Sequence, residues 1–94
     1  MESEEIISSI FRIKNKLGLH ARAAATFVRL SNKFSSDIKL IKDGYEVNGK
    51  SILGILSLAA IQGTEIKISV KGEDAREALK EIEKLIESGF GEGT

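Results

Sequence analysis

The residue of this chain best suited to chemistry is His20, its only histidine, which lies where a loop meets the expected start of a helix and two positions before Arg22. The first backbone N–H groups of a helix are unpaired and carry partial positive charge, so they stabilise an anion placed on the imidazole. Imidazole is largely neutral, and therefore nucleophilic, at neutral pH. His20 is thus a candidate phosphoryl acceptor, and a histidine that simply caps the helix or lies in water is the alternative.

Residues 44–51, GYEVNGKS, satisfy the P-loop pattern of nucleotide-binding enzymes. A P-loop wraps its backbone amides tightly around phosphate, whereas Tyr45, Glu46 and Val47 are bulky and alternate like a strand after the Asp43-Gly44 turn. The larger parallel α/β domain that accompanies such loops also exceeds 94 residues. We therefore interpret this match as a coincidence, with a small nucleotide-binding enzyme as the alternative.

A metal site has little support, because one histidine and no cysteine leave only carboxylates, which show no calcium- or magnesium-loop spacing. We predict no metal and no cofactor.

Ser51 precedes the apolar stretch ILGILSL and is expected to cap a short helix there, with regulatory phosphorylation as the sharper hypothesis. The stretch is too apolar for its length to bury every side chain. The outward residues are either scattered surface apolar side chains or a docking patch close to His20.

Composition limits the function classes. The chain has 94 residues, 41% of them hydrophobic and 30% charged, which predicts one globular domain over residues 1–94. Fourteen basic and fourteen acidic residues give no net charge, so nucleic-acid binding has no support and partners are expected to be proteins. The absence of cysteine, of a signal peptide and of a membrane-spanning stretch favours a cytoplasmic protein.

The elements that position these residues follow from hydrophobic periodicity. Alternation predicts strands over residues 6–14, 37–42, 45–48 and 65–71. Helical stripes begin at Ala21 and Ser51, and the clearest covers residues 73–88, with Gly89 at the expected C′ position. Residues 90–94 are expected to form a flexible tail. The order βαββαβα predicts an α+β fold with three helices on one face of a four-stranded antiparallel sheet.

Two segments, GLHAR at residues 18–22 and NGKSILGILSL at residues 48–58, resemble the signature regions of the histidine-containing phosphocarrier protein HPr family. This family belongs to the bacterial phosphoenolpyruvate-dependent sugar phosphotransferase system. The resemblance covers nearly the whole chain and implies the family's open-faced sandwich, a transient phosphohistidine and a carrier rather than an enzyme.

The resemblance also implies roles for individual residues. His20 would accept the phosphoryl group on Nδ1 from phosphorylated Enzyme I and pass it to an Enzyme IIA domain. The Arg22 side chain would steady the group, and the backbone of Ala21 and Arg22 would contact it. Ser51 would be the site of a dedicated serine kinase, whose product binds a transcription regulator in some bacteria. The docking surface would comprise Ile52, Leu53 and Leu56, and the carrier would be a monomer.

One departure from the family pattern is Ala23, where relatives usually have proline directly after the arginine. Proline would fix φ in the first helical turn, so alanine allows the helix with a less rigid start. The change leaves open a paralogue of the nitrogen-related, regulatory branch. A purely regulatory protein of this fold, which acts through the serine, is a further alternative that the presence of His20 disfavours.

Overall fold

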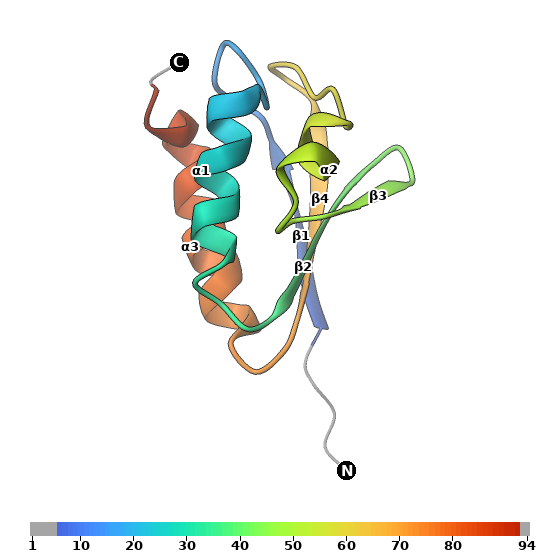
Figure 1. Ribbon diagram of the computed structural model, residues 1–94, viewed down its shortest axis with the longest axis vertical. Helices are drawn as coiled ribbons and strands as arrows, with labels where there is room; N and C mark the ends of the chain where they lie inside the picture. The colour runs from blue at the N-terminus through green and yellow to red at the C-terminus, as the bar shows by residue number, and fades with distance from the viewer. Residues whose placement is uncertain (1–5, 93–94) are drawn as a thin grey trace.

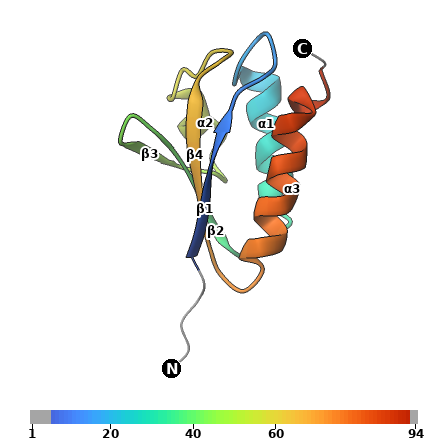
Figure 2. The same ribbon diagram turned by 180° about the vertical axis from the view of Figure 1, so that it is seen from behind.

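The structure, a computed structural model, describes residues 6–92 and has two layers, a sheet and the helices that cover one of its faces (Figures 1 and 2). The strands are β1 (Ile6–Arg12), β2 (Asp37–Lys42), β3 (Tyr45–Asn48) and β4 (Glu65–Lys71). All pairs are antiparallel, in the order β1-β4-β2-β3. The helices are α1 (Ala21–Ser31), α2 (Ile52–Leu56) and α3 (Ala75–Glu87). The predicted fold class is confirmed.

The strands form because apolar side chains alternate with polar ones and the sheet has one covered face. On the central strand β4, Ile66, Ile68 and Val70 are fully buried. Register extends this apolar row across the sheet, since Ile68 lies opposite Leu40 of β2, and Leu40 lies opposite Val47 of β3. The other sheet face carries the polar residues of the alternation together with Ile6 and Ile10 of β1, which are exposed.

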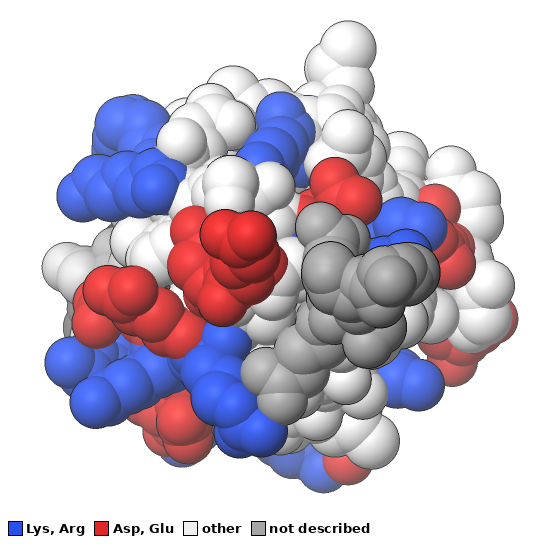
Figure 3. Space-filling view, turned by 90° about the horizontal axis from the view of Figure 1, so that it is seen from below, with Lys and Arg blue, Asp and Glu red and all other residues white. Residues whose placement is uncertain are grey.

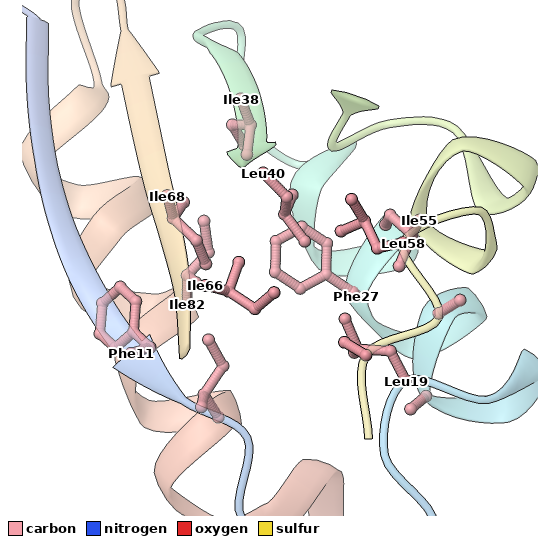
Figure 4. Packing of buried hydrophobic residues seen from close by; sticks show 14 of the residues in the cluster. Phe11, Leu19, Phe27, Ile38, Leu40, Ile55, Leu58, Ile66, Ile68 and Ile82 are labelled. Atoms are coloured by element: carbon pink, nitrogen blue, oxygen red, sulfur yellow. The ribbon is translucent and has the colours of Figure 1, made fainter. Parts of the chain in front are cut away.

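Helices α1 and α3 each present one apolar stripe to the sheet. In α1 the buried residues include Ala23, Ala24, Phe27 and Val28, and Figure 4 shows Phe27 pointing toward Leu40 of β2. In α3 the stripe consists of Ala75, Ala78, Ile82 and Ile86. The small alanines of α3 let its backbone approach β1 and β4 closely, whereas the backbone of α1 lies beside α2 and α3.

Two expected element boundaries differ in the structure. Strand β1 ends at Arg12 rather than at residue 14, although Ile13 still exchanges backbone hydrogen bonds with the 63–64 loop. Helix α3 begins at Ala75 rather than at residue 73. The carboxylate of Asp74 does not cap α3, because it accepts hydrogen bonds from Ser35 and Ser36 at the start of β2 instead.

We expected a flexible tail over residues 90–94, and the structure places residues 90–92 in and after a turn that packs on the core. A 3-10 turn, η1 (Gly89–Gly91), follows α3, and the side chain of Phe90 is only 6% exposed. Burying this aromatic side chain holds the turn against the core. Residues 93–94 lie outside the described residues. Both views place η1 beside the N-terminus of α1 (Figures 1 and 2).

Charged side chains of both signs lie close together on the face that Figure 3 shows. Figure 3 views the end of the molecule away from the N-terminus of α1, and basic and acidic side chains are interspersed there. Ion pairs such as Arg12–Glu65 and Lys39–Glu46 join exposed side chains of both signs. Among the described residues, no helix combines the length and apolar character needed to cross a membrane.

Candidate functional site

His20 is the N-cap residue of α1 and is held there by a tight contact between two loops. The backbone N–H of Leu19 donates to the carbonyl of Ala60 at 2.9 Å, and the Leu19 side chain is buried. Gly18 has a φ of 69°, and a Cβ at this position would lie 2.4 Å from the oxygen of Ala60. Only glycine fits this approach, so the loop sequence itself places His20 at the end of the helix.

The imidazole of His20 faces the first free amides of α1. Its Nδ1 atom accepts the backbone N–H of Arg22 at 3.3 Å, and 26% of the side chain remains exposed. Ala21 and Arg22 are exposed, so solvent reaches the first turn of the helix. The predicted position at a helix N-terminus is confirmed. The side chain of His20 therefore caps the helix and is at the same time partly exposed to solvent.

The other ring nitrogen contacts a residue that sequence reasoning missed. Nε2 of His20 lies 2.6 Å from Oε2 of Glu92, whose side chain is 16% exposed. Oε1 of Glu92 accepts a hydrogen bond from Nδ2 of the buried Asn15 at 3.0 Å. Burial raises the pKa of Glu92, but the hydrogen bonds from Asn15 and His20 outweigh burial and leave that pKa below its usual value. Glu92 is therefore a carboxylate at neutral pH.

Arg22 and Ala23 are neighbours in the first turn of α1, but one is exposed and the other is buried. The Arg22 side chain is exposed, and its positive charge contributes to the lowered pKa of Glu92, which places the guanidinium in the electrostatic environment of the site. Ala23 is completely buried. The helix begins normally without proline, since the N–H of Ala24 donates to the carbonyl of His20 at 2.9 Å.

Ser51 caps α2, as predicted. Its Oγ atom accepts the backbone N–H of Gly54 at 2.9 Å, and its own backbone is extended. A Cβ on Gly54 would lie 3.2 Å from this oxygen, so glycine at position 54 leaves room for the cap. The Ser51 side chain is half-buried.

The apolar helix α2 divides its side chains between core and solvent. Ile55 is fully buried, Leu56 is half-buried and packs against the core, and Ile52 and Leu53 are exposed, Leu53 by 79%. Two further apolar side chains, Leu17 and Ile61, are 67% and 71% exposed on the loops that meet at Gly18. We call Leu17, Ile52, Leu53 and Ile61 the exposed apolar set. Sequence reasoning missed Leu17 and Ile61, because loop residues show no periodicity.

The P-loop pattern does not form a phosphate cradle. Asp43 and Gly44, with φ of 51° and 82°, make the turn between β2 and β3, and Tyr45–Asn48 is strand β3. The backbone amides of the pattern thus pair with β2 instead of converging on one point. The structure supports interpreting the match as coincidence. Within residues 6–92, no group of three His, Cys, Asp or Glu side chains is placed to hold a metal ion.

Comparison with known proteins agrees with this geometry. Residues 7–88 match the family PTS-HPr, described as the PTS HPr component phosphorylation site. The phosphocarrier protein HPr of Xylella fastidiosa is 48% identical over 82 residues, which cover 87% of this chain and 92% of that protein. The crystal structure of HPr-C-His from Thermoanaerobacter tengcongensis superimposes with a TM-score of 0.90 at 51% identity, covering 94% of this chain and 99% of that one. The crystal structure of Bacillus subtilis Crh, described as a catabolite repression protein and a domain-swapped dimer, gives a TM-score of 0.72 at 44% identity, covering 84% and 91%.

Proposed function

The chain belongs to the HPr family of phosphocarrier proteins of the phosphotransferase system, and within that role we propose that Nδ1 of His20 carries the phosphoryl group. The observation that carries this proposal is the position of Nδ1, which lies 3.3 Å from the backbone N of Arg22 at the open end of α1. A phosphoryl group on this nitrogen would meet unpaired amides and the positive end of the helix.

Charge compensation follows from the same geometry. The phosphoryl group carries close to two negative charges at neutral pH. The N–H groups of Ala21 and Arg22 belong to the first turn of α1 and have no acceptor within the helix. When Nδ1 forms its bond to phosphorus, it ceases to accept the N–H of Arg22, and that N–H becomes available to a phosphoryl oxygen. The exposed guanidinium of Arg22 adds a charged donor to these backbone N–H groups.

The transfer step is an in-line displacement at phosphorus. The lone pair of Nδ1 forms the new N–P bond while the bond between phosphorus and the imidazole of phosphorylated Enzyme I breaks. The bonding pair leaves with the donor nitrogen. In the second transfer, an imidazole nitrogen of the Enzyme IIA domain forms the new bond to phosphorus while the bond between Nδ1 of His20 and phosphorus breaks, and the electron pair returns to Nδ1. The protein contributes positioning and charge compensation rather than covalent assistance.

Docking of both partners is assigned to the apolar surface around the site. Ile52 and Leu53 are exposed on α2, which packs against α1, and Leu56 contributes the part of its side chain that the core leaves free. Small apolar surfaces of this kind suit transient complexes, in which a carrier must release each partner after transfer. We expect the chain to be a monomer, so that this surface is free. Sedimentation equilibrium tests that expectation against a dimer such as Crh.

Regulation through Ser51 is a second function that the likeness to Crh favours. A serine kinase that modifies Ser51 would place a dianion at the N-terminus of α2, where the helix tolerates it. The dianion would also border the exposed Ile52 and Leu53. We propose that this modification weakens docking of Enzyme I and creates a surface for a transcription regulator.

The test is incubation with phosphoenolpyruvate and Enzyme I, followed by intact mass. We expect one added phosphoryl group that is lost in acid and kept in base, and no addition to His20→Ala. An acid-stable phosphate, or a phosphoryl group on His20→Ala, would overturn the assignment. Offering the phosphorylated chain to Enzyme IIA domains of the sugar branch and of the nitrogen branch then identifies the branch it serves.

A further inference from the structure

We propose that Glu92 is a positioning residue for phosphoryl transfer, holding the His20 proton on Nε2 so that the Nδ1 lone pair faces the incoming phosphorus. This inference rests on the proposed function, in which Nδ1 is the acceptor. It adds a residue from the opposite end of the chain, because Glu92 lies 72 positions after His20 in the sequence.

The two hydrogen bonds of the ring require the same tautomer. A backbone N–H can only donate, so Nδ1 must accept from Arg22 with its lone pair. An ionised carboxylate can only accept, so Nε2 must donate to Oε2 of Glu92. Both conditions are met when the proton is on Nε2. The tautomer that exposes a nucleophilic Nδ1 is therefore selected from two sides.

Glu92 is itself fixed by a buried partner. Asn15 is completely buried and donates through Nδ2 both to the carbonyl of Gly18 at 2.8 Å and to Oε1 of Glu92 at 3.0 Å. Its Oδ1 atom accepts no hydrogen bond from any group in residues 6–92. Leaving a buried oxygen unpaired is unfavourable. The two hydrogen bonds that Nδ2 donates offset this cost and hold the Asn15 amide in its orientation. Asn15 thus links the loop that carries His20 to the carboxylate that orients the ring.

The backbone before Glu92 is also held in an uncommon conformation. Gly89, Phe90 and Gly91 have φ of 66°, 59° and 75°, all in the left-handed region. A non-glycine residue adopts this region only where its surroundings impose it. Burial of the Phe90 side chain imposes it here, and the turn directs the chain back toward α1. The short path from α3 to His20 is therefore built into the C-terminal segment.

The carboxylate also has a role during the transfer itself. When the Nδ1 lone pair forms the bond to phosphorus, the ring gains positive charge and the proton remains on Nε2. Glu92, on the side of the ring away from the phosphoryl group, stabilises that charge through a charge-assisted hydrogen bond. This is the role that an orienting carboxylate has beside a reacting histidine in hydrolase triads. Because Glu92 does not touch phosphorus, it positions the acceptor and is not a catalytic residue.

The experiment compares Glu92→Ala and Glu92→Gln with wild type and with Glu87→Gln as matched control. Glu87 is an exposed carboxylate at the end of α3, and its ion-pair partner is Lys14 rather than His20. Nitrogen-15 shifts of the His20 ring report the tautomer, and single-turnover phosphorylation by Enzyme I reports the rate. In wild type and Glu87→Gln we expect a protonated Nε2 and an unprotonated Nδ1. In Glu92→Ala the two shifts should move toward each other, and the rate should fall by about tenfold.

Glu92→Gln separates geometry from charge, since its amide oxygen can still accept from Nε2. We expect it to retain the wild-type tautomer and to be phosphorylated at a rate between those of Glu92→Ala and wild type. Unchanged shifts in Glu92→Ala would overturn the inference, and so would an unchanged rate. If wild type takes no phosphoryl group on His20, the proposed function fails. The ring shifts would then still report whether Glu92 selects the tautomer.

Discussion

The Oγ atom of Ser51 lies 2.9 Å from the backbone N of Gly54 and accepts its N–H, so this hydroxyl caps the N-terminus of helix α2. The same residue borders Ile52 and Leu53, two of the exposed apolar set. A negative charge at position 51 is favourable for the helix, because it meets the positive end of the dipole. The same charge disfavours binding of any partner that covers the neighbouring apolar side chains, because the charged group must lose its hydrating water when the partner binds. Helix stability and docking should respond to this position in opposite directions.

Replacing Ser51 with aspartate should therefore leave the fold intact and impair docking. Aspartate keeps a capping acceptor, whereas desolvation of its charge should remove roughly 1–3 kcal/mol of binding free energy to Enzyme I. We expect a KM for this carrier that is raised by the corresponding factor, measured in steady-state phosphorylation at two salt concentrations. A KM equal to that of wild type would mean that Ile52 and Leu53 do not form the docking surface for Enzyme I.

Ser51→Ala is the control for this prediction. It removes the cap and adds no charge, so the free energy of unfolding should fall by about 1 kcal/mol while KM stays at the wild-type value. A raised KM in Ser51→Ala would mean that distortion of α2, not charge, explains the aspartate variant.

Arg22→Ala should slow transfer without removing the acceptor. The guanidinium supplies charge-assisted contacts to the phosphoryl group, but the backbone amides of the first turn of α1 remain in place. We expect a fall of about tenfold in the single-turnover rate with both Enzyme I and an Enzyme IIA domain, and an unchanged yield of acid-labile phosphate. Equal rates in wild type and Arg22→Ala would exclude the side chain from the site.

Asp74 provides a prediction for stability rather than transfer. Its carboxylate accepts hydrogen bonds from the side chain of Ser36 and from the backbone N–H groups of Ser35 and Ser36. The Ser36 hydroxyl and then the Ser35 N–H hold the pKa of Asp74 below its usual value, although burial opposes them. Asp74→Asn should lower the free energy of unfolding at neutral pH by about 1–2 kcal/mol, measured by urea denaturation.

The pH dependence of this contribution has a definite sign. Because the pKa of Asp74 is lower in the folded state than in the unfolded state, the stabilisation is present above the ordinary aspartate value of about 3.9. It is lost as pH falls through the lower folded pKa. The difference in the free energy of unfolding between wild type and Asp74→Asn should therefore be smaller when urea denaturation is measured in strong acid than at neutral pH. A difference that grows in acid would contradict the assigned contacts.

The strands and helices could be predicted because their signal is local. Alternation in β4 and the apolar stripe of α3 are visible in short windows, and burial of Ile68 and Ile82 confirms both. The N-cap positions of His20 and Ser51 were predictable for the same reason, since each precedes an apolar helical pattern.

The contacts that complete the site could not be predicted, because they join distant segments. Glu92 contacts His20 through a turn in which Phe90 adopts a left-handed backbone, whereas the sequence FGEGT at residues 90–94, with two glycines in five residues, favours a flexible tail. Asp74 has the residue type of a helix cap, yet its carboxylate accepts hydrogen bonds from Ser36 in the loop before β2. Which group accepts or donates each of these hydrogen bonds depends on the segments that tertiary packing brings together. The periodicity of the sequence does not contain that information.

The most direct test of the account is to locate the phosphoryl group on the ring of His20. The chain, with nitrogen-15 in histidine, is phosphorylated by Enzyme I and phosphoenolpyruvate, and the coupling of phosphorus to each ring nitrogen is recorded by NMR. The account predicts coupling to Nδ1, which faces the N–H of Arg22, and none to Nε2, which faces Glu92. Coupling to Nε2, or phosphate found on Ser51 with His20 unmodified, would contradict it.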